Sequence, residues 1–430
     1  MDPLLLTYGN RACHAPSGAV KGSKDRIKTG ANVPIAKTAA APSVEADAIN
    51  YMVNPFAVAS IVAPNASIRG ASLSRIAEIL HIPTSVFLSP TSSPLRHNAL
   101  GAGGPSSYAV IGVQEALHDP RSAQWNPPYN RFGRWSYVAP MFNGTPRFTD
   151  PVQGAITNCP LISSLASVAL TMPSRIERRA TMVDSATLSE EERIRNIVLS
   201  DGWGDHNTSL SERVPQIVAQ PGGPSASLVP FAQNGWSISG QSYAAWPAVF
   251  EKAIAIHNLR VAHDQPNYTR CNYWGVQRFD ESGNVTASIH PITAITGIPT
   301  ERIELAGHTT DEIWSYVSER AGGKDGRAMV PMVCGVDNDP RIPAVEYDRE
   351  SLAPNHAYSL LGAIQSKGRR FLVLRNPWGC YEPSGDGTMP GVWQGVELSA
   401  NNGLFAYDVD RFKRYFGNSP LSRIYSAARQ

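Results

Sequence analysis

The chain has 430 residues, 42% of them hydrophobic, which is enough to bury one large core or two to three smaller ones. Its 38 basic and 36 acidic side chains leave a formal net charge of +2, too close to balance to indicate nucleic acid or a membrane as an obligatory partner. Long apolar runs are absent, and the opening MDPLLLTYGN lacks the pattern of a secretory signal, so a soluble cytoplasmic protein is the default expectation.

The cysteines are expected to be reduced thiols. There are five, an odd number without any Cys-x-x-Cys pair that would indicate a structural zinc site or a redox motif. Cys334 lies in the apolar run AMVPMVCGV and is predicted to be a small buried side chain on a strand. The other four are Cys13, Cys159, Cys271 and Cys380.

Residues 1–46 are predicted to form a disordered tail. They are rich in Ala, Ser, Pro, Gly and Lys without an apolar period, so they cannot bury enough surface to offset the chain entropy lost on folding. The composition would also suit a leader for signal-independent export as an effector, or a flexible pro-segment. Both roles stay open.

Residues 47–92 are predicted to form a small helical module, with Ser72 placed to cap a helix. The string ASLSRIAEILHIPTSVF is similar to the two core helices of a bacterial helix-turn-helix, which would imply DNA binding. The basic surface that DNA binding needs is not evident there, so nucleic acid is not expected as a partner. The apolar residues at helical spacing are Leu73, Ile76, Ala77 and Leu80.

Residues 93–130 hold many Pro, Gly and Ser and are predicted to be a linker or surface loop. Their string GAGGPSS lacks the Lys and the strand-to-helix context of a phosphate-binding loop. From about residue 131 the composition is that of a packed domain, with aromatic residues and apolar segments nearly to the C-terminus.

Cys159 is the candidate nucleophile. It stands in QGAITNCPLISSLASVAL at the start of a predicted helix, because Pro160 suits a first helical position and an apolar stripe follows. Unpaired N–H groups and the positive end of the helix dipole favour a thiolate there. A cysteine that merely begins a core helix is the alternative. The stripe consists of Leu161, Ile162, Leu165, Val168 and Ala169.

His356 and Asn376 are the candidate base and its orienting partner. They stand in NHAYSLLGAIQSKGRRFLVLRNPWG, where two apolar runs flank SKG and predict a β-hairpin with its turn centred near Ser366. Both residues are ten positions from that centre, so they are expected to face each other across the open end. An amide oxygen there accepts from one ring N–H and leaves the other ring nitrogen for a thiol.

Two further segments are predicted to be structural. YAAWPAVFEKAIA gives a helix with an apolar stripe and is assigned to the core, not to the site. LFAYDVDRFKRYF gives a closing strand and helix. The stripe of the first segment consists of Trp246, Val249, Phe250, Ala253 and Ile254.

These motifs together resemble the calpain family of cysteine proteases over roughly residues 131 to 428. DPVQGAITNC is similar to the calpain segment with an Asp, a Gln-Gly-Ala and the catalytic Cys in fixed order, and Asp150, Gln153 and Cys159 hold those places. NHAYSLLGA and LRNPWG are similar to the segments around the catalytic His and Asn. The resemblance implies that Gln153 donates to the oxyanion and that Trp378 covers the His356 to Asn376 hydrogen bond.

The resemblance also implies an α+β, papain-like core of two subdomains, and a thiol endopeptidase that acts on proteins or peptides through an acyl-enzyme. Residues 131–262 would form a mostly helical subdomain carrying the nucleophile, and residues 263–428 a β-rich subdomain carrying His and Asn. A transglutaminase or acyltransferase with the same triad is the second enzyme hypothesis. A non-catalytic regulatory or DNA-binding protein is the third.

The chain departs from the calpain pattern beside the nucleophile, where packing and substrate fit are expected to differ, and at positions that concern calcium. Calpains have Asp before the nucleophile and Trp after it, where this chain has Asn158 and Pro160. At one calcium site of the family, Cys380, Asn402 and Leu404 stand where acidic residues are usual, and neutral side chains do not supply the charged oxygen ligands that Ca²⁺ favours.

Asp150 is the candidate ligand for the other calcium site, with Asp205 as an acidic companion. We therefore expect that no cofactor is required and that calcium dependence is weak or missing. No EF-hand loop of the D-x-D-x-D-G type is present in the sequence either.

Overall fold

The computed structural model describes the parts of the chain in which the sequence motifs fall. The described residues are 70–80, 133–137, 139–154, 158–182, 193–217, 232–234, 244–261, 275–279, 285–336, 339, 341–417, 419 and 422–429. The predicted tail 1–46 and linker 93–130 lie outside them. Of the predicted module 47–92, only residues 70–80 are described.

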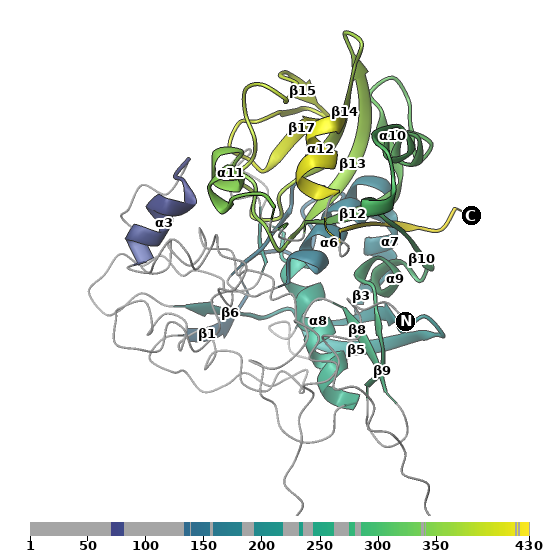
Figure 1. Cartoon of the computed structure of the whole chain (residues 1–430). Helices are drawn as coiled ribbons and strands as arrows, with labels where there is room; N and C mark the ends of the chain where they lie inside the picture. The colour runs from purple at the N-terminus through teal and green to yellow at the C-terminus, as the bar shows by residue number, and fades with distance from the viewer. Residues whose placement is uncertain are drawn as a thin grey trace, which may run out of the picture.

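A seven-stranded antiparallel sheet forms the upper part of the molecule in Figure 1. The hairpin that the sequence predicts, made of β13 and β14, lies within this sheet between β12 and the edge strand β17. Cys334 lies on β12 and is fully buried, as predicted. In spatial order the strands are β10 (Thr300–Glu304), β18 (Arg423–Ala427), β12 (Arg327–Val336), β13 (His356–Ser366), β14 (Arg369–Arg375) and β17 (Leu404–Asp408), with β11 (Ala321–Gly322) paired to β12.

Helices cover both faces of this sheet. Val333 and Ala357 share one apolar cluster with Cys159 of α6 (Cys159–Thr171). Tyr358, the next residue along β13, packs instead against Phe416 of α12 (Val409–Phe416), with the ring centroids 5.3 Å apart. Because successive strand residues point to opposite faces, α6 and α12 lie on opposite sides of the sheet. Helix α10 (Thr310–Ser318) packs beside α12.

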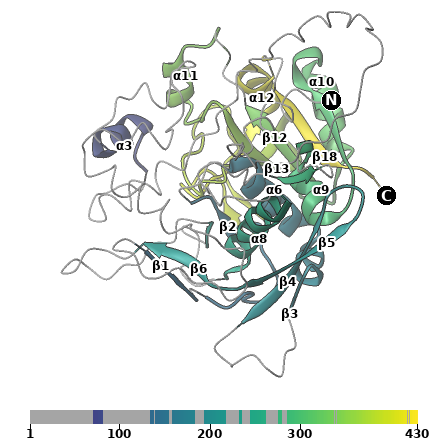
Figure 2. The same ribbon diagram turned by 90° about the horizontal axis from the view of Figure 1, so that it is seen from below.

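The other half of the structure surrounds α8 (Trp246–Val261), which is buried on all sides as far as residue 258. The three-stranded sheet β3 (Ala180–Met182), β4 (Ile194–Ser200) and β5 (Asp205–Ser211) packs against it, as Figure 2 shows from below. The hairpin β8 (Val276–Phe279) and β9 (Val285–Ile289) and helix α9 (Pro291–Thr296) complete this half.

The fold is a mixture of helix and sheet, in line with the predicted α+β class, but the half that carries Cys159 is not mostly helical. Residues 194–211 form a hairpin because Ile197, Leu199 and Leu210 point toward the core while intervening residues stay partly exposed. Val276 and α9, which follow the predicted boundary between residues 262 and 263, share the core of α6 and α8.

Helix α3 (Leu73–Leu80) uses its apolar face to join the same core. Leu73 and Ile76 are fully buried in a cluster that contains Trp246 and Tyr381. The Ser72 hydroxyl accepts from the Arg75 N–H at 3.1 Å, so the predicted cap is confirmed. The second helix of the predicted helix-turn-helix lies outside the described residues.

Smaller elements connect these layers. None of the helices among the described residues has the length and apolarity needed to cross a membrane. The remaining elements are β1 (Gly133–Ser136), β2 (Pro151–Val152), α7 (Pro173–Arg178), β6 (Val214–Ile217), β7 (Gln233–Asn234), η2 (Leu305–Gly307), α11 (Ala344–Arg349), β15 (Val392–Trp393) and β16 (Val396–Glu397).

Candidate active site

Cys159 lies at the N-terminal end of α6, as the sequence predicts, although it is Cys159 and not Pro160 that is the first residue of the helix. Pro160 follows it, so the second position of the helix has no N–H to satisfy. The N–H of Leu161 donates to the Asn158 backbone carbonyl at 2.9 Å. The side chain of Asn158 makes no capping bond to α6, although asparagine is among the preferred residues at this position.

Serine side chains fix α6 against the sheet. The Ser163 hydroxyl donates to the Ala357 carbonyl at 3.0 Å, and the Ser359 hydroxyl donates to the Ser163 carbonyl at 2.9 Å. One turn further on, the Ser167 hydroxyl accepts from the Met332 N–H at 2.7 Å. These bonds set the register of the helix on the strands. The only sign of them in the sequence is the spacing of Ser163 and Ser167 by one helical turn.

The register places the Cys159 thiol beside the start of β13. The sulfur accepts from the Ala357 N–H at 3.4 Å. Ala357 directly follows His356, so a helix start and a strand start nearly 200 residues apart in the sequence meet at this point. The predicted approach of the thiol to the histidine segment is therefore present in the fold.

His356 and Asn376 meet, but not by facing each other in the ladder. The turn of the hairpin lies at Lys367 and Gly368, both with positive φ, and not at Ser366. A bulge between Leu360 and Gly362 shifts the register again, and the last pair is Ser359 with Arg375. The prediction that His356 and Asn376 face each other as a pair in the hairpin was therefore wrong. Their predicted contact is confirmed, because His356 Nε2 lies 2.9 Å from Asn376 Oδ1.

The orientation of the Asn376 amide determines the histidine tautomer. The Nδ2 group donates to the Tyr381 carbonyl at 2.8 Å, and Oδ1 accepts from the Trp378 N–H at 3.0 Å. Oδ1 is therefore the atom that faces His356, and Nε2 must carry the proton. Nδ1, which has no hydrogen-bond partner among the described residues, then has a lone pair to accept a proton.

Trp378 covers this hydrogen bond from the side. Its ring lies 4.4 Å from that of His356, measured between centroids, and it is fully buried. A covered hydrogen bond does not compete with water, which strengthens it. This contact is the one that the family resemblance predicted for Trp378.

Gln153 lies in a segment that is bound to the loop after Asn376. Its backbone N–H donates to the Pro377 carbonyl at 2.7 Å, and its side chain is fully buried. The buried guanidinium of Arg375 donates to the Pro151 carbonyl at 2.7 Å and to the Thr149 carbonyl at 3.3 Å. The segment that carries the predicted oxyanion donor is thus held against the segment that carries Asn376.

Burial sets the charge states at the site. Cys159, His356 and Asn376 have no solvent-exposed surface in this structure. Burial raises the pKa of Cys159 well above its usual value, and the bond from Ala357 opposes this only in part. Burial lowers the pKa of His356 to about 3, although the hydrogen bond to Asn376 acts in the opposite direction and raises it. Burial therefore favours the uncharged forms of both the thiol and the imidazole.

Glu251 is a buried group near the nucleophile that the sequence analysis assigned to the core. One carboxyl oxygen accepts from Asn158 Nδ2 and the other from the Ala232 N–H, both at 2.6 Å. Burial raises its pKa to about 8. The adjacent Lys252 is also buried, and its ammonium donates to the Ser211 and Arg213 carbonyls, each at 2.8 Å. The signal available in the sequence was the Glu-Lys pair itself, because the residues on both sides of it in the helix are apolar.

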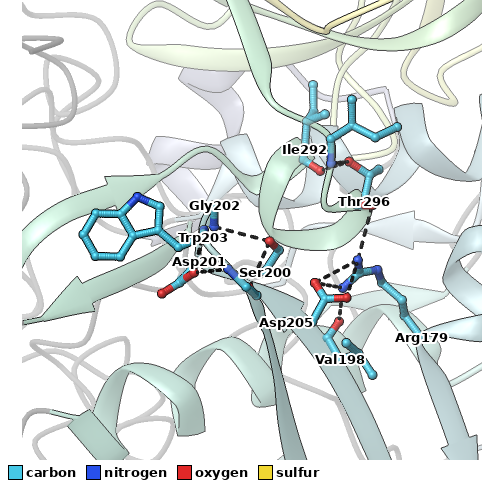
Figure 3. A network of polar contacts seen from close by, with 11 residues as sticks. Arg179, Val198, Ser200, Asp201, Gly202, Trp203, Asp205, Ile292 and Thr296 are labelled. Atoms are coloured by element: carbon cyan, nitrogen blue, oxygen red, sulfur yellow. Dashed lines mark hydrogen bonds and ion pairs between the residues drawn. The ribbon is translucent and has the colours of Figure 1, made fainter. Parts of the chain in front are cut away.

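The candidate calcium ligands are not brought into one cluster. The Asp150 carboxylate accepts from Trp246 Nε1 at 3.0 Å and from the Arg147 N–H at 2.9 Å. Asp205 instead forms an ion pair with Arg179 at 3.1 Å, next to the end of α9 (Figure 3). Among the described residues, no group of three or more His, Cys, Asp or Glu could hold a metal ion.

The positions of the other calcium site of calpains are occupied by internal hydrogen bonds. The Glu382 carboxylate accepts from the Asn402 N–H at 2.8 Å and from the Gly403 N–H at 3.0 Å. The side-chain oxygen of Asn402 accepts from the Leu404 N–H at 2.9 Å. Cys380 is buried next to this network, with burial and the charge of Glu382 both raising its thiol pKa.

Comparison with known proteins relates the chain to a thiol protease. No family model matches the chain. Over 308 residues the chain is 24% identical to a thiol protease of Porphyromonas gingivalis (strain ATCC BAA-308 / W83), and the match covers 64% of this chain and 55% of that protein. The chain thus spans about half the length of that relative. The similarity supports a cysteine protease in general.

Proposed function

We propose that this chain is a papain-like cysteine endopeptidase of the calpain type. The observation that carries the proposal is the meeting of three groups from distant segments: the Cys159 thiol beside the Ala357 N–H, and His356 Nε2 bonded to Asn376 Oδ1 at 2.9 Å. The similarity to a thiol protease supports the coarser part of the proposal, a cysteine protease in general. Protein or peptide is the substrate class.

In the proposed mechanism, Cys159 is the nucleophile and His356 acts first as a base and then as an acid. His356 Nδ1 takes the thiol proton, and the Cys159 sulfur attacks the scissile carbonyl. Gln153 and the Cys159 N–H stabilise the resulting oxyanion. The imidazolium then gives its proton to the leaving amine, and the neutral ring activates a water molecule that hydrolyses the acyl-enzyme.

The burial of the reacting side chains adds one requirement to this mechanism. Because both reacting side chains are buried, substrate or water must reach them before an ion pair is stabilised.

The test is a comparison of the wild type with Cys159→Ala. Both proteins are incubated with a proteome, and new peptide termini are identified by mass spectrometry. Cleavage by the wild type and none by Cys159→Ala supports the proposal. Cys334→Ala is the matched control, because it removes a buried thiol from β12 while the triad remains.

Three outcomes would contradict the proposal. Equal cleavage by the wild type and Cys159→Ala would remove Cys159 from the nucleophile role. Incorporation of an added primary amine in place of hydrolysis would indicate a transglutaminase or acyltransferase with the same triad. Complete inactivity of a folded wild type, whose Cys159 is also not labelled by a thiol-directed peptide warhead, would favour a non-catalytic protein.

A further inference from the structure

We propose that Glu251 is a positioning residue for the nucleophile: its carboxyl group anchors the Asn158 side chain and so fixes the direction of the thiol and the N–H of Cys159 at the N-terminus of α6. The inference rests on the proposed function, because it concerns the N–H of Cys159 as an oxyanion donor. Its basis is the pair of hydrogen bonds that Glu251 accepts.

The first step is the unusual behaviour of Asn158. Asparagine at a helix N-cap normally turns its side-chain oxygen back to an N–H in the first turn of its own helix. Here that bond is missing, and Asn158 Nδ2 donates to Glu251 Oε1 at 2.6 Å. Asn158 Oδ1 has no hydrogen-bond partner among the described residues. The side chain is therefore directed to α8 and not to α6.

The second step is the rigidity of the group that holds it. Glu251 is fully buried, and its other oxygen accepts from the Ala232 N–H at 2.6 Å. Its helix is fixed at its start, where the Trp246 N–H donates to the Met141 carbonyl at 3.0 Å and Trp246 Nε1 donates to Asp150. A carboxyl group held at both oxygens on a buried helix is a fixed reference point for Asn158.

The third step is the consequence for catalysis. Asn158 directly precedes Cys159, so its position determines where the thiol and the N–H of Cys159 point. The link does not depend on the protonation of Glu251, because the Asn158 amide has both a donor and an acceptor.

The test measures kcat and KM for a peptide substrate in Glu251→Ala, Asn158→Ala and the double variant. Each single change should lower kcat by about 10²-fold with little change in KM, because misplacing the reacting group affects the chemical step. The double variant should lose no more than either single variant, because Glu251 acts through Asn158. Rates are normalised to folded protein measured by circular dichroism.

Two further variants separate positioning from stability. Glu251→Gln should keep most of the activity, because its amide can accept from Ala232 and donate to Asn158 Oδ1. Lys252→Met removes the neighbouring buried charge of α8, which bonds the Ser211 and Arg213 carbonyls. It should lower the melting temperature and leave kcat of the folded protein unchanged.

The outcomes distinguish this inference from the proposed function. An active wild type with an unchanged kcat in folded Asn158→Ala or Glu251→Ala overturns the inference and leaves the protease assignment intact. Additive losses in the double variant also overturn it. If Glu251→Ala does not fold, the inference is judged from the other variants: kcat should be lowered in Asn158→Ala, and activity should be kept in Glu251→Gln. A wild type without Cys159-dependent turnover overturns both.

Discussion

Asn376 has its side-chain amide fixed by two contacts besides its hydrogen bond to His356. Asn376 Nδ2 donates to the Tyr381 carbonyl. Asn376 Oδ1 accepts from both the Trp378 N–H and the His356 imidazole. Gly403 supports the same residue from behind, since its carbonyl accepts the Asn376 N–H at 2.8 Å and a Cβ there would lie 2.7 Å from the Asn376 carbonyl. A single amide orientation therefore defines the proton position on the ring.

Asn376→Ala should lower kcat by about 10²-fold, because the imidazole loses the acceptor that selects its tautomer. The measurement is steady-state hydrolysis of a peptide by folded protein. Tyr381→Phe is the matched control, since it keeps the backbone carbonyl that receives Asn376 Nδ2 and should stay close to wild type. An Asn376→Ala protein with wild-type kcat would remove Asn376 from the triad.

Glu251 should make stability depend on pH with a definite sign. Its pKa is raised from 4.5 to about 8, so the folded protein holds this proton more tightly than the unfolded chain, and its contribution to stability is lost as pH rises between these values. The pKa of Lys252 is lowered from 10.5 to about 7, so its unfavourable burial is relieved as pH rises from about 7 to 10.5.

Glu251→Gln should therefore gain stability relative to wild type as pH rises from about 5 to about 7. In this range the titration of Glu251 changes the stability of the wild type, whereas the effect of Lys252 begins only above about pH 7. Thermal unfolding of both proteins across this range measures the difference. The contributions of all other groups cancel in the comparison. A difference that stays constant with pH would mean that Glu251 is ionised in the folded protein throughout.

At the scale of elements, α6 is bound to the sheet by polar contacts as well as apolar ones. Its serines at helical spacing reach backbone groups of β12 and β13. Apolar packing alone tolerates sliding of a helix along a sheet, whereas a hydrogen bond fixes one register because an unmatched buried donor is costly. The serines therefore decide where Cys159 lies along β13.

Ser167→Ala should lower the free energy of unfolding by roughly 1–3 kcal/mol, because the buried Met332 N–H loses its acceptor. Chemical denaturation measures the change. Ser164→Ala is the control on the same helix, since the Ser164 hydroxyl bonds only the Pro160 carbonyl one turn back among the described contacts. It should cost less than Ser167→Ala. Equal costs would show that the contact to the sheet has no special weight.

At the scale of the whole molecule, the two halves meet at the site itself. Arg375 and Pro377 bind the segment that carries Gln153, and α6 lies between the large sheet and α8. Helix α3, from the N-terminal part of the chain, reaches the same region, where Asp348 accepts from both Ser74 and Tyr381. The apolar face of α3 is thus used within this core.

Peptide cleavage should persist when calcium is removed with a chelator. The reason is chemical: Cys380, Asn402 and Leu404 offer no charged oxygen, and Asp150 is engaged by Trp246. The measurement is the rate of peptide hydrolysis with chelator and after readdition of Ca²⁺ or Mg²⁺. Activity that disappears with chelator and returns with calcium alone would contradict this prediction.

The sequence by itself determined the features that depend on short stretches of chain. The start of α6 at Cys159, the hairpin that presents His356 and Asn376, and the burial of Cys334 all follow from local spacing and turn residues. Three motifs in fixed order then suggested one site.

Only the tertiary structure decided how these pieces fit. The bulge in β13, the tautomer of His356, the serine contacts of α6 and the link from Glu251 to Asn158 join residues that are far apart in the chain or depend on atomic positions. A hydrogen bond across 93 residues leaves no periodic signal, because its energy comes from placing two groups within 3 Å and not from their spacing in sequence.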